Sequence, residues 1–185
     1  MANILPDILK FAAQAHGSQM RKYASEPYIR HPERVMETCK EYTSDIHILS
    51  AALLHDVLED TPVTEKEMFD FLEQISDTET ANKIMSLVVD LTDVFVKKDY
   101  PQWNRRKRKA MEVERLTKTS ADSQTVKYAD IIGNAKDIVR DDKDFAVVFL
   151  RECKSLLKKL DKGDPGLYLR AVTAVEEGLK QIGRK

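Results

Sequence analysis

The sequence predicts an all-α protein in which a single domain, residues 1–185, forms a helical bundle. Nearly every segment carries apolar residues at helical spacing, and only six Gly and six Pro residues punctuate the 185-residue chain. The stretch from residue 45 to 60 is apolar in almost every direction, which is typical of a buried central helix. A chain of this length, without repeats, linkers or low-complexity tracts, can bury a substantial core around that helix.

Composition excludes several classes of protein. The net charge of −1 provides no overall field that would recruit nucleic acid or a membrane surface. The two cysteines, Cys39 and Cys153, lack the spacing of a metal or redox motif, which indicates a reducing compartment. The N-terminus has no basic region typical of a signal peptide, and no apolar segment is long enough to span a membrane. We therefore expect a cytoplasmic protein, and its oligomeric state stays open.

Prolines divide the N-terminal part of the chain. Pro6 fits the first turn of a helix whose apolar stripe ends at His16, and such a histidine is more typical of a core than of a ligand site. Pro32 suits the first turn of a helix over 32–42, which would hold His31 in an extended conformation at the N-cap. From this stretch alone, His31 fits a metal ligand and a surface cap equally well.

Start signals and amphipathic spacing define the later helices. A capping box from Thr64 to Glu67 opens a short helix, and Ser76-Asp77 marks the start of another. Ser120 can cap a helix that carries Asp130. The last three expected helices are 121–140, 145–160 and 167–182, and Asp164-Pro165 opens the last of them.

The helical pattern breaks from Thr92 to Trp103, and basic residues crowd the overlapping stretch from residue 97 to 109. Because the whole chain is nearly neutral and only Tyr100 and Trp103 are interleaved aromatics, the run indicates a solvated helix face rather than a nucleic-acid surface. Binding of an anionic ligand is the minor alternative.

The end of the central helix carries four titratable side chains. At helical spacing His55, Asp56, Glu59 and Asp60 fall within an arc of roughly 140°. Burying an imidazole with three carboxyl groups is costly unless a bound cation pairs with them. Solvated charges at a helix end before Pro62 are the simpler alternative, but the apolar run that leads into His55-Asp56 favours a metal site.

Two further positions complete a possible ligand set. Asp130 lies on a partly apolar helix, with Asn134 one turn later. Together, His31, His55, Asp56 and Asp130 make a mixed nitrogen and oxygen set suited to manganese, iron, zinc or nickel. The sequence contains no glycine-rich phosphate loop, nucleophile elbow or paired catalytic cysteine. Metal-assisted hydrolysis is the remaining chemistry, with Glu59 and Asp60 placed to transfer protons.

Three separated motifs give this set a family resemblance. Residues 16–32 read HGSQMRK followed by PYIRHP, residues 51–61 read AALLHDVLEDT, and residues 126–134 read VKYADIIGN. They resemble the motifs HxxQxRK…PYxxHP, ALLHDxxED and KxADxxxN of the hydrolase domain of RelA/SpoT homologues, within the HD superfamily of metal-dependent phosphohydrolases. The match covers residues 8–140, Ser25 stands where the family often has glycine, and residues 141–185 are expected to be scaffold helices.

The resemblance implies a stand-alone alarmone hydrolase of the stringent response. In that reading one manganese(II) per chain is held by His31, His55, Asp56 and Asp130. Glu59 and Asp60 position and activate water, whereas Arg21 and Lys22 contact the guanine side of the substrate and Asn134 its ribose. The implied reaction removes pyrophosphate from the 3′ position of (p)ppGpp and leaves GDP or GTP.

Other functions stay open at this stage. Some stand-alone relatives act as NADPH 2′-phosphatases with the same metal set, and other HD proteins hydrolyse different nucleotides. A non-catalytic nucleotide-binding module is the alternative from another class, although binding alone does not require proton-transfer groups such as Glu59 and Asp60. In every case the expected partner is a small-molecule nucleotide.

Overall fold

The computed structural model describes residues 3–22 and 26–183, and in these ranges the chain forms ten α-helices without a β-strand. An isolated β-bridge between Met20 and Pro27 is the one extended pairing among the described residues. The all-α prediction is confirmed, whereas Ser25 lies outside the described residues. The helices are α1 (Leu5–His16), α2 (Arg30–Lys40), α3 (Ile46–Leu54), α4 (Val57–Asp60), α5 (Glu65–Ile75), α6 (Thr78–Leu91), α7 (Arg105–Leu116), α8 (Ala121–Asp141), α9 (Lys143–Leu157) and α10 (Pro165–Ile182).

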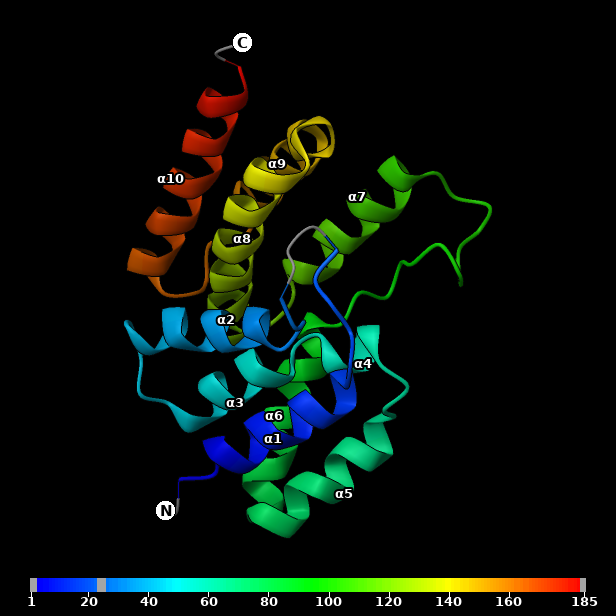
Figure 1. The fold of residues 1–185 in the computed structure, drawn as a ribbon, viewed down its shortest axis with the longest axis vertical. Coiled ribbons are helices and arrows are strands. Elements are labelled where there is room, and N and C mark those ends of the chain that lie inside the picture. The colour runs from blue at the N-terminus through cyan, green and yellow to red at the C-terminus, as the bar shows by residue number, and fades with distance from the viewer. Residues whose placement is uncertain (1–2, 23–25, 184–185) are drawn as a thin grey trace.

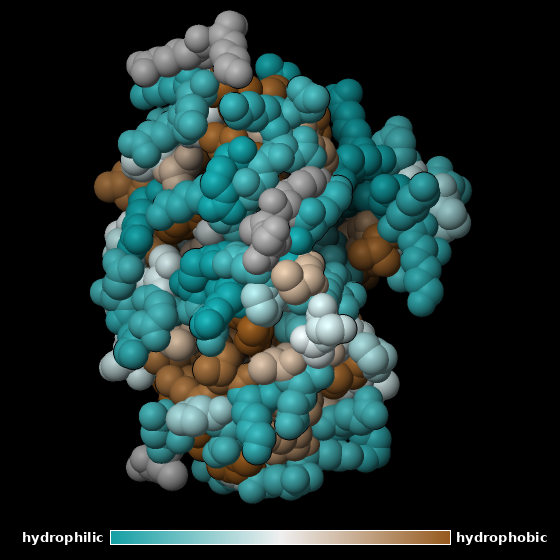
Figure 2. Space-filling model, viewed as in Figure 1, coloured by the Kyte–Doolittle hydropathy of each residue, from teal (hydrophilic) through white to brown (hydrophobic). Residues whose placement is uncertain are grey.

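The helices form two groups joined by α2 and α3 (Figure 1). In the upper group α9 and α10 pack against the long helix α8, and in the lower group α1, α5 and α6 surround α3 and α4. Helix α2 contacts both α3 and α8, and α7 lies to one side of the upper group. Hydrophilic residues cover most of the face seen in Figure 2, and hydrophobic residues show mainly over the lower group.

Helix α3 occupies the centre of the core, as its apolar sequence predicts. All of its residues from Ile48 to Leu54 are buried. The surrounding core cluster draws apolar side chains from α1, α2, α5, α6, α8, α9 and α10, including Ile8, Val35, Leu72 and Leu167. Among the described residues, no helix combines the length and apolar character needed to cross a membrane.

The central helix ends earlier than predicted, because it breaks at His55-Asp56 between α3 and α4. The imidazole Nδ1–H of His55 donates to the carbonyl oxygen of Ala52 at 2.8 Å. In an uninterrupted α-helix that carbonyl would accept the amide of residue 56. A side chain that competes for a backbone acceptor favours a local break, so the expectation of one continuous helix over 45–60 is wrong.

His31 also differs from its predicted conformation. It is the second residue of α2, and its backbone amide donates to Tyr28 O at 3.0 Å, so it is helical rather than extended. Pro32 then falls in the first turn, where a missing N–H costs no intrahelical hydrogen bond. The imidazole is 1% exposed and therefore not a surface cap.

Most of the other helix starts agree with the sequence. Thr64 and Glu67 form the predicted capping box, and Asp77 and Ser120 cap α6 and α8. Helix α9 begins two residues earlier than predicted, whereas α10 begins at Asp164-Pro165, the start signal in the sequence. Asp142 and Asp164 cap these two helices by accepting the amides of Phe145 and Leu167, a signal that apolar spacing does not reveal.

Candidate active site

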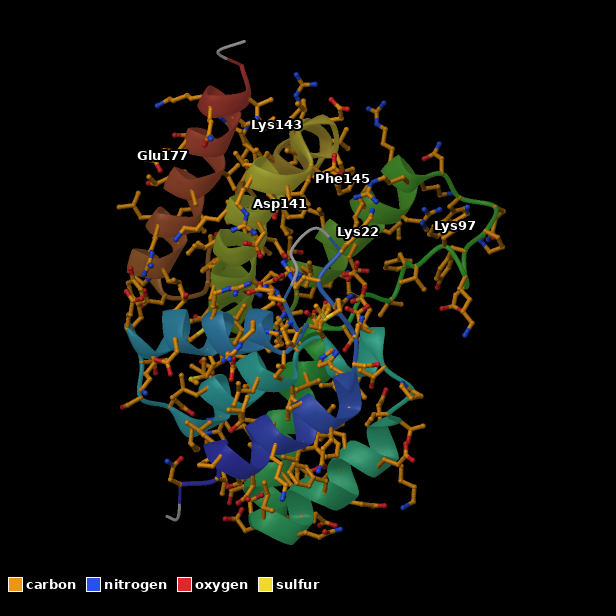
Figure 3. The ribbon with its side chains drawn as sticks, in the orientation of Figure 1. Lys22, Lys97, Asp141, Lys143, Phe145 and Glu177 are labelled. Atoms are coloured by element: carbon orange, nitrogen blue, oxygen red, sulfur yellow. The ribbon has the colours of Figure 1, made fainter. Side chains whose placement is uncertain are left out.

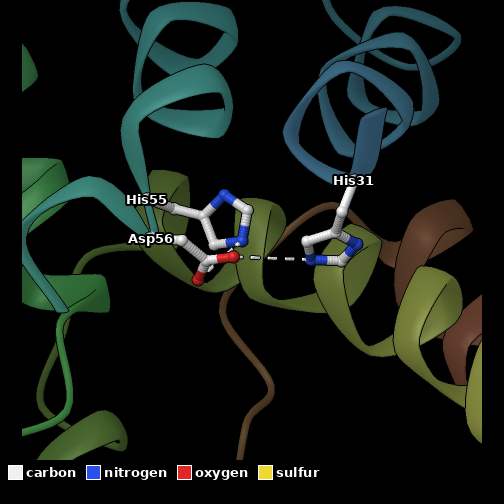
Figure 4. Close-up of side chains that lie close together, drawn as sticks. All are labelled: His31, His55 and Asp56. Carbon is white, nitrogen blue, oxygen red and sulfur yellow. Dashed lines mark ion pairs between the residues drawn. The ribbon is translucent and has the colours of Figure 1, made fainter. Parts of the chain in front are cut away.

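Three helical segments bring the predicted ligand residues together. His31 comes from the first turn of α2, His55 and Asp56 from the break between α3 and α4, and Asp130 from the middle of α8. Ligand atoms of His31, His55 and Asp56 all lie within 4.8 Å of one another (Figure 4). Asp130 Oδ1 lies 3.1 Å from His31 Nε2 and 3.7 Å from His55 Nε2. The four predicted residues therefore form one cluster.

The imidazole of His55 has the features of a metal ligand. Because a carbonyl can only accept a hydrogen bond, the contact with Ala52 places a proton on Nδ1 and leaves Nε2 to face the carboxylates. Nε2 is buried and makes no hydrogen bond to the described residues, although Asp56 Oδ1 is 3.1 Å away. Burial would lower the pKa of His55, but Asp56 and Asp130 outweigh it and raise that pKa to about 10. The same negative charge suits a divalent cation.

Asp130 is oriented by hydrogen bonds with Asn134, Lys127 and His31. Its Oδ1 accepts from Asn134 Nδ2 at 2.6 Å, while Oδ2 accepts from Lys127 Nζ at 2.9 Å. Burial would raise the pKa of Asp130, but the charge of Lys127, the hydrogen bond with His31 and the nearby imidazole of His55 hold that pKa well below its ordinary value. Asp130 is therefore ionised, and its Oδ1 is directed at the imidazole pair. This donor set fits a divalent transition-metal ion.

Glu59 and Asp60 lie one turn after the His55-Asp56 pair, on α4. The Asp93 amide donates to Glu59 Oε2 at 3.3 Å. Glu59 and Asp60 are exposed, so they are not buried with His55 as the sequence predicts. Desolvation by the surrounding protein, followed by repulsion from Asp93, still raises the pKa of Glu59 to about 7. A carboxyl group with such a pKa can accept and release a proton near neutral pH.

The hydroxyl group of Tyr28 bridges the carboxylates of Asp56 and Asp60. Its hydroxyl lies 2.9 Å from Asp56 Oδ2 and 2.5 Å from Asp60 Oδ2. Its ring stacks on His16 with 4.5 Å between centroids, which explains why His16 is buried next to the site without joining the ligand cluster. The sequence analysis did not assign a role to Tyr28. Its position three residues before His31, in the same motif, could have indicated a site residue.

The predicted substrate residues border the cluster. Arg21 Nη2 donates to Asn134 Oδ1 at 3.1 Å and to Asp137 Oδ2 at 2.8 Å, so Arg21 and Asn134 are neighbours. Lys22 is exposed, and Figure 3 labels it near the centre of the molecule. Arg21 is held in place by Asn134 and Asp137. Asn134 is in turn tied to Asp130, one turn earlier on α8, because its Nδ2 donates to Asp130 Oδ1.

A cavity of about 890 Å³ reaches Asp130 and Lys127 from the side of α7 and α9. Its walls combine apolar residues of α7, α8 and α9 with charged groups that include Arg105, Arg106 and Lys109. Part of the basic run therefore lines a cavity instead of forming only a solvated face.

Asp93 is a cavity residue that the sequence analysis did not single out. It lies just after α6, where it lines the cavity and accepts from Lys109 Nζ at 2.8 Å.

Comparison with known proteins assigns the chain to a family. A family model described as an HD domain matches residues 9–160. The chain belongs to the HD domain family. Its HD relatives include guanosine-3′,5′-bis(diphosphate) 3′-pyrophosphohydrolase MESH1 of Homo sapiens, with 35% identity over 133 residues, and its counterpart from Xenopus tropicalis, with 30% over 142 residues. These matches cover 70% and 75% of this chain, and 66% and 72% of the human and frog proteins.

A solved structure supports the HD fold over nearly the whole chain. It belongs to a protein described as a metazoan orthologue of SpoT that hydrolyses ppGpp, and it superimposes with a TM-score of 0.76 at 24% identity. The superposition covers 97% of both chains. It therefore includes α9 and α10, which lie largely beyond the region of motif resemblance.

Proposed function

We propose that this protein hydrolyses guanosine 3′,5′-bis(diphosphate) and its pentaphosphate analogue at the 3′ position, releasing pyrophosphate and GDP or GTP. The observation that carries the proposal is the cluster of His31, His55, Asp56 and Asp130 next to a cavity with cationic groups on its walls. The 35% identity with a human protein named for this activity supports the choice of substrate.

The proposed ligands are His31, His55, Asp56 and Asp130, and the proposed ion is one manganese(II) per chain. Two imidazoles and two carboxylates suit manganese better than magnesium, which favours oxygen ligands. When bound, such an ion polarises a phosphoryl oxygen and acidifies water. His55 supports this assignment because its Nε2 is buried, without a hydrogen bond to the described residues, and faces two carboxylates.

The protein's own residues would divide the remaining work. Glu59 accepts a proton from the attacking water, a role supported by its raised pKa, and Asp60 handles a second proton transfer. Tyr28 keeps Asp60 beside Asp56. Arg21, Lys22 and Asn134 would hold the nucleoside part of the substrate.

Basic residues on the cavity wall would hold the phosphate groups. Arg106 and Lys109 of α7 line the cavity, and so does Lys127 of α8, which donates to Asp130 Oδ2 at 2.9 Å. Charge-assisted hydrogen bonds from such groups bind phosphate oxygens strongly. A volume of about 890 Å³ falls within the range of small-molecule sites. These features support a polyphosphorylated nucleotide as the ligand.

We also propose that residues 1–185 act as a single HD-type domain in the cytoplasm. One core cluster contains residues from the first helix to the last, including Ile8 and Val175, which supports one cooperative unit.

The deciding experiment is a substrate panel with purified, manganese-loaded protein. Release of pyrophosphate from ppGpp and pppGpp is expected, with much slower release of phosphate from NADPH or of tripolyphosphate from dGTP. Faster hydrolysis of NADPH than of ppGpp would assign the site to 2′-phosphatase chemistry. Binding of ppGpp with no hydrolysis of any of these nucleotides would favour the non-catalytic module.

A further inference from the structure

The carboxylate of Asp137 accepts hydrogen bonds from three arginines that lie in different parts of the chain. It lies on α8, two turns after Asp130, and is buried. Its Oδ2 accepts from Arg21 Nη2 at 2.8 Å and from Arg34 Nη2 at 3.3 Å, and its Oδ1 accepts from Arg140 Nη2 at 3.3 Å.

The orientation of Arg21 depends on this carboxylate. Arg21 Nη2 is shared between Asp137 and Asn134, and the Arg21 Cζ atom lies 5.6 Å from the centroid of the Tyr28 ring. The Arg21 side chain is only 13% exposed. Two acceptors and an aromatic ring therefore restrict a guanidinium that would otherwise sample many rotamers.

Arg34 extends the same network to the segment that precedes α2. It forms a two-point pair with Glu26, with Nη2–Oε1 at 2.7 Å and Nη1–Oε2 at 3.0 Å, while also donating to Asp137. Through Arg21 and Arg34, Asp137 connects α8 to the residues just after α1 and to α2. Arg140 is paired in addition with Asp141, at 2.6 and 2.8 Å.

The guanidinium charge of Arg21 is balanced by nearby carboxylates, which limits the role that Arg21 can have in binding. The network contains three guanidinium groups, on Arg21, Arg34 and Arg140, and three carboxylates, on Asp137, Glu26 and Asp141. The charge of Arg21 is thus already compensated in the free protein. Arg21 then serves as a rigid, directional group rather than as an unpaired cation that captures phosphate.

We propose that Asp137 is a positioning residue that orients Arg21 for the nucleoside part of the substrate. This inference rests on the proposed function and deepens it. Asp137 lies seven residues after Asp130, roughly 10 Å along the helix axis. It therefore acts on substrate binding through Arg21 and not on the reacting phosphate. Fixing Arg21 in advance reduces the entropy that binding must overcome.

The test compares Asp137→Asn with Asp141→Asn. Both substitutions remove one carboxylate from the arginine network, but Asp141, labelled near the end of α8 in Figure 3, accepts hydrogen bonds from Arg140, whereas Asp137 accepts one directly from Arg21. We expect Asp137→Asn to weaken ppGpp binding to the metal-free protein about tenfold, the effect of losing a charge-assisted hydrogen bond. With manganese, KM should rise by a similar factor and kcat should change less than about threefold. Asp141→Asn should match wild type in both.

A double-mutant cycle distinguishes the positioning of Arg21 by Asp137 from a general effect of Asp137 on the stability of the fold. If Asp137 acts through Arg21, the double variant Asp137→Asn, Arg21→Ala should bind ppGpp no more weakly than Arg21→Ala alone. In the absence of ligand, the NMR signals of the Arg21 Nη–H groups should exchange faster with solvent in Asp137→Asn, because Nη2 makes the contact with Asp137. Additive losses in the cycle, or an unchanged Arg21 signal, would overturn the inference.

The two proposals fail in different ways. If wild type binds ppGpp but does not hydrolyse it, the proposed reaction is wrong, and the cycle measured on binding still decides the role of Asp137. If wild type hydrolyses ppGpp while Asp137→Asn keeps the wild-type KM, the positioning role is wrong and the reaction stands. If wild type does not bind ppGpp at all, both are wrong.

Discussion

The Nδ1–H of His55 donates to the carbonyl oxygen of Ala52 across 2.8 Å, within one helical turn of the central helix. This single contact has two consequences. It occupies a backbone acceptor at the point where α3 gives way to α4, and it leaves Nε2 facing Asp56 and Asp130. A local hydrogen bond thus creates the break in the helix and orients an imidazole for a cation.

The first prediction concerns metal content. Wild-type protein should bind about one divalent transition-metal ion per chain because the cluster supplies one ligand set. His55→Ala should lose that ion, as measured by elemental analysis of gel-filtered protein. His47→Ala is the matched control, because His47 lies on the same helix and pairs with Asp45, outside the cluster. After treatment with chelator, manganese should restore activity better than magnesium. Two tightly bound ions per chain would contradict this prediction.

The second prediction separates the ligand from the proton-transfer groups. Asp56→Ala should lose both metal and activity. Glu59→Gln and Asp60→Asn should keep the metal, while kcat falls roughly 10²–10⁴-fold, the usual contribution of general acid–base catalysis. Glu65→Gln, an exposed position at the start of α5, is a control for removal of a nearby acidic charge. Wild-type turnover in both of the first two amide variants would refute the catalytic assignment.

The third prediction is a pH dependence. Glu59 has a pKa raised to about 7, so its proton is lost only as the pH rises through that value. A general base must be ionised, and therefore kcat/KM should increase with pH up to about 7 and then level off. The rising limb should be absent from the residual activity of Glu59→Gln. A wild-type profile that is flat between pH 5.5 and about 8, bracketing this pKa, would argue against Glu59 as the base.

The fourth prediction concerns the proposed substrate residues. Arg21→Ala and Lys22→Ala should each weaken ppGpp binding by about 1.5–3 kcal/mol, the value of a hydrogen bond to a charged group. Metal content should not change, since neither residue belongs to the cluster. Lys97→Ala provides the control, because Lys97 is an exposed cation on the outer part of the segment between α6 and α7 (Figure 3). Unchanged Michaelis constants in both variants would place Arg21 and Lys22 outside the substrate site.

The fifth prediction addresses stability away from the site. Gly163 joins α9 to α10, and a Cβ atom there would lie 2.5 Å from Tyr128 Cε2 and 2.8 Å from the backbone nitrogen of Thr125. Gly163→Ala should lower the free energy of unfolding by about 1–3 kcal/mol because the backbone of α8 must shift. Gly183→Ala is the control, since its Cβ would approach the Leu179 carbonyl oxygen at 3.3 Å. Denaturant midpoints at constant m-value would measure the difference.

Much of the fold and of the ligand cluster could be predicted from local patterns. The capping box of Thr64 and Glu67 and the side-chain caps at Asp77 and Ser120 are hydrogen bonds between residues at most three apart. Such contacts depend on the nearby sequence and therefore appear in it directly. The motifs around His31, His55-Asp56 and Asp130 likewise selected the residues that meet in the structure.

Other features depend on packing between helices and could not be read from spacing. The partners Arg21 and Asp137 are 116 residues apart, and Asp93 meets Lys109 across the segment between α6 and α7. The sequence by itself determined the helical class, most helix starts and the types of ligand residue, because these follow from local periodicity and capping. Only the tertiary structure decided which charges neutralise one another, because those pairings exist only after α2, α7 and α8 have packed around the central helix.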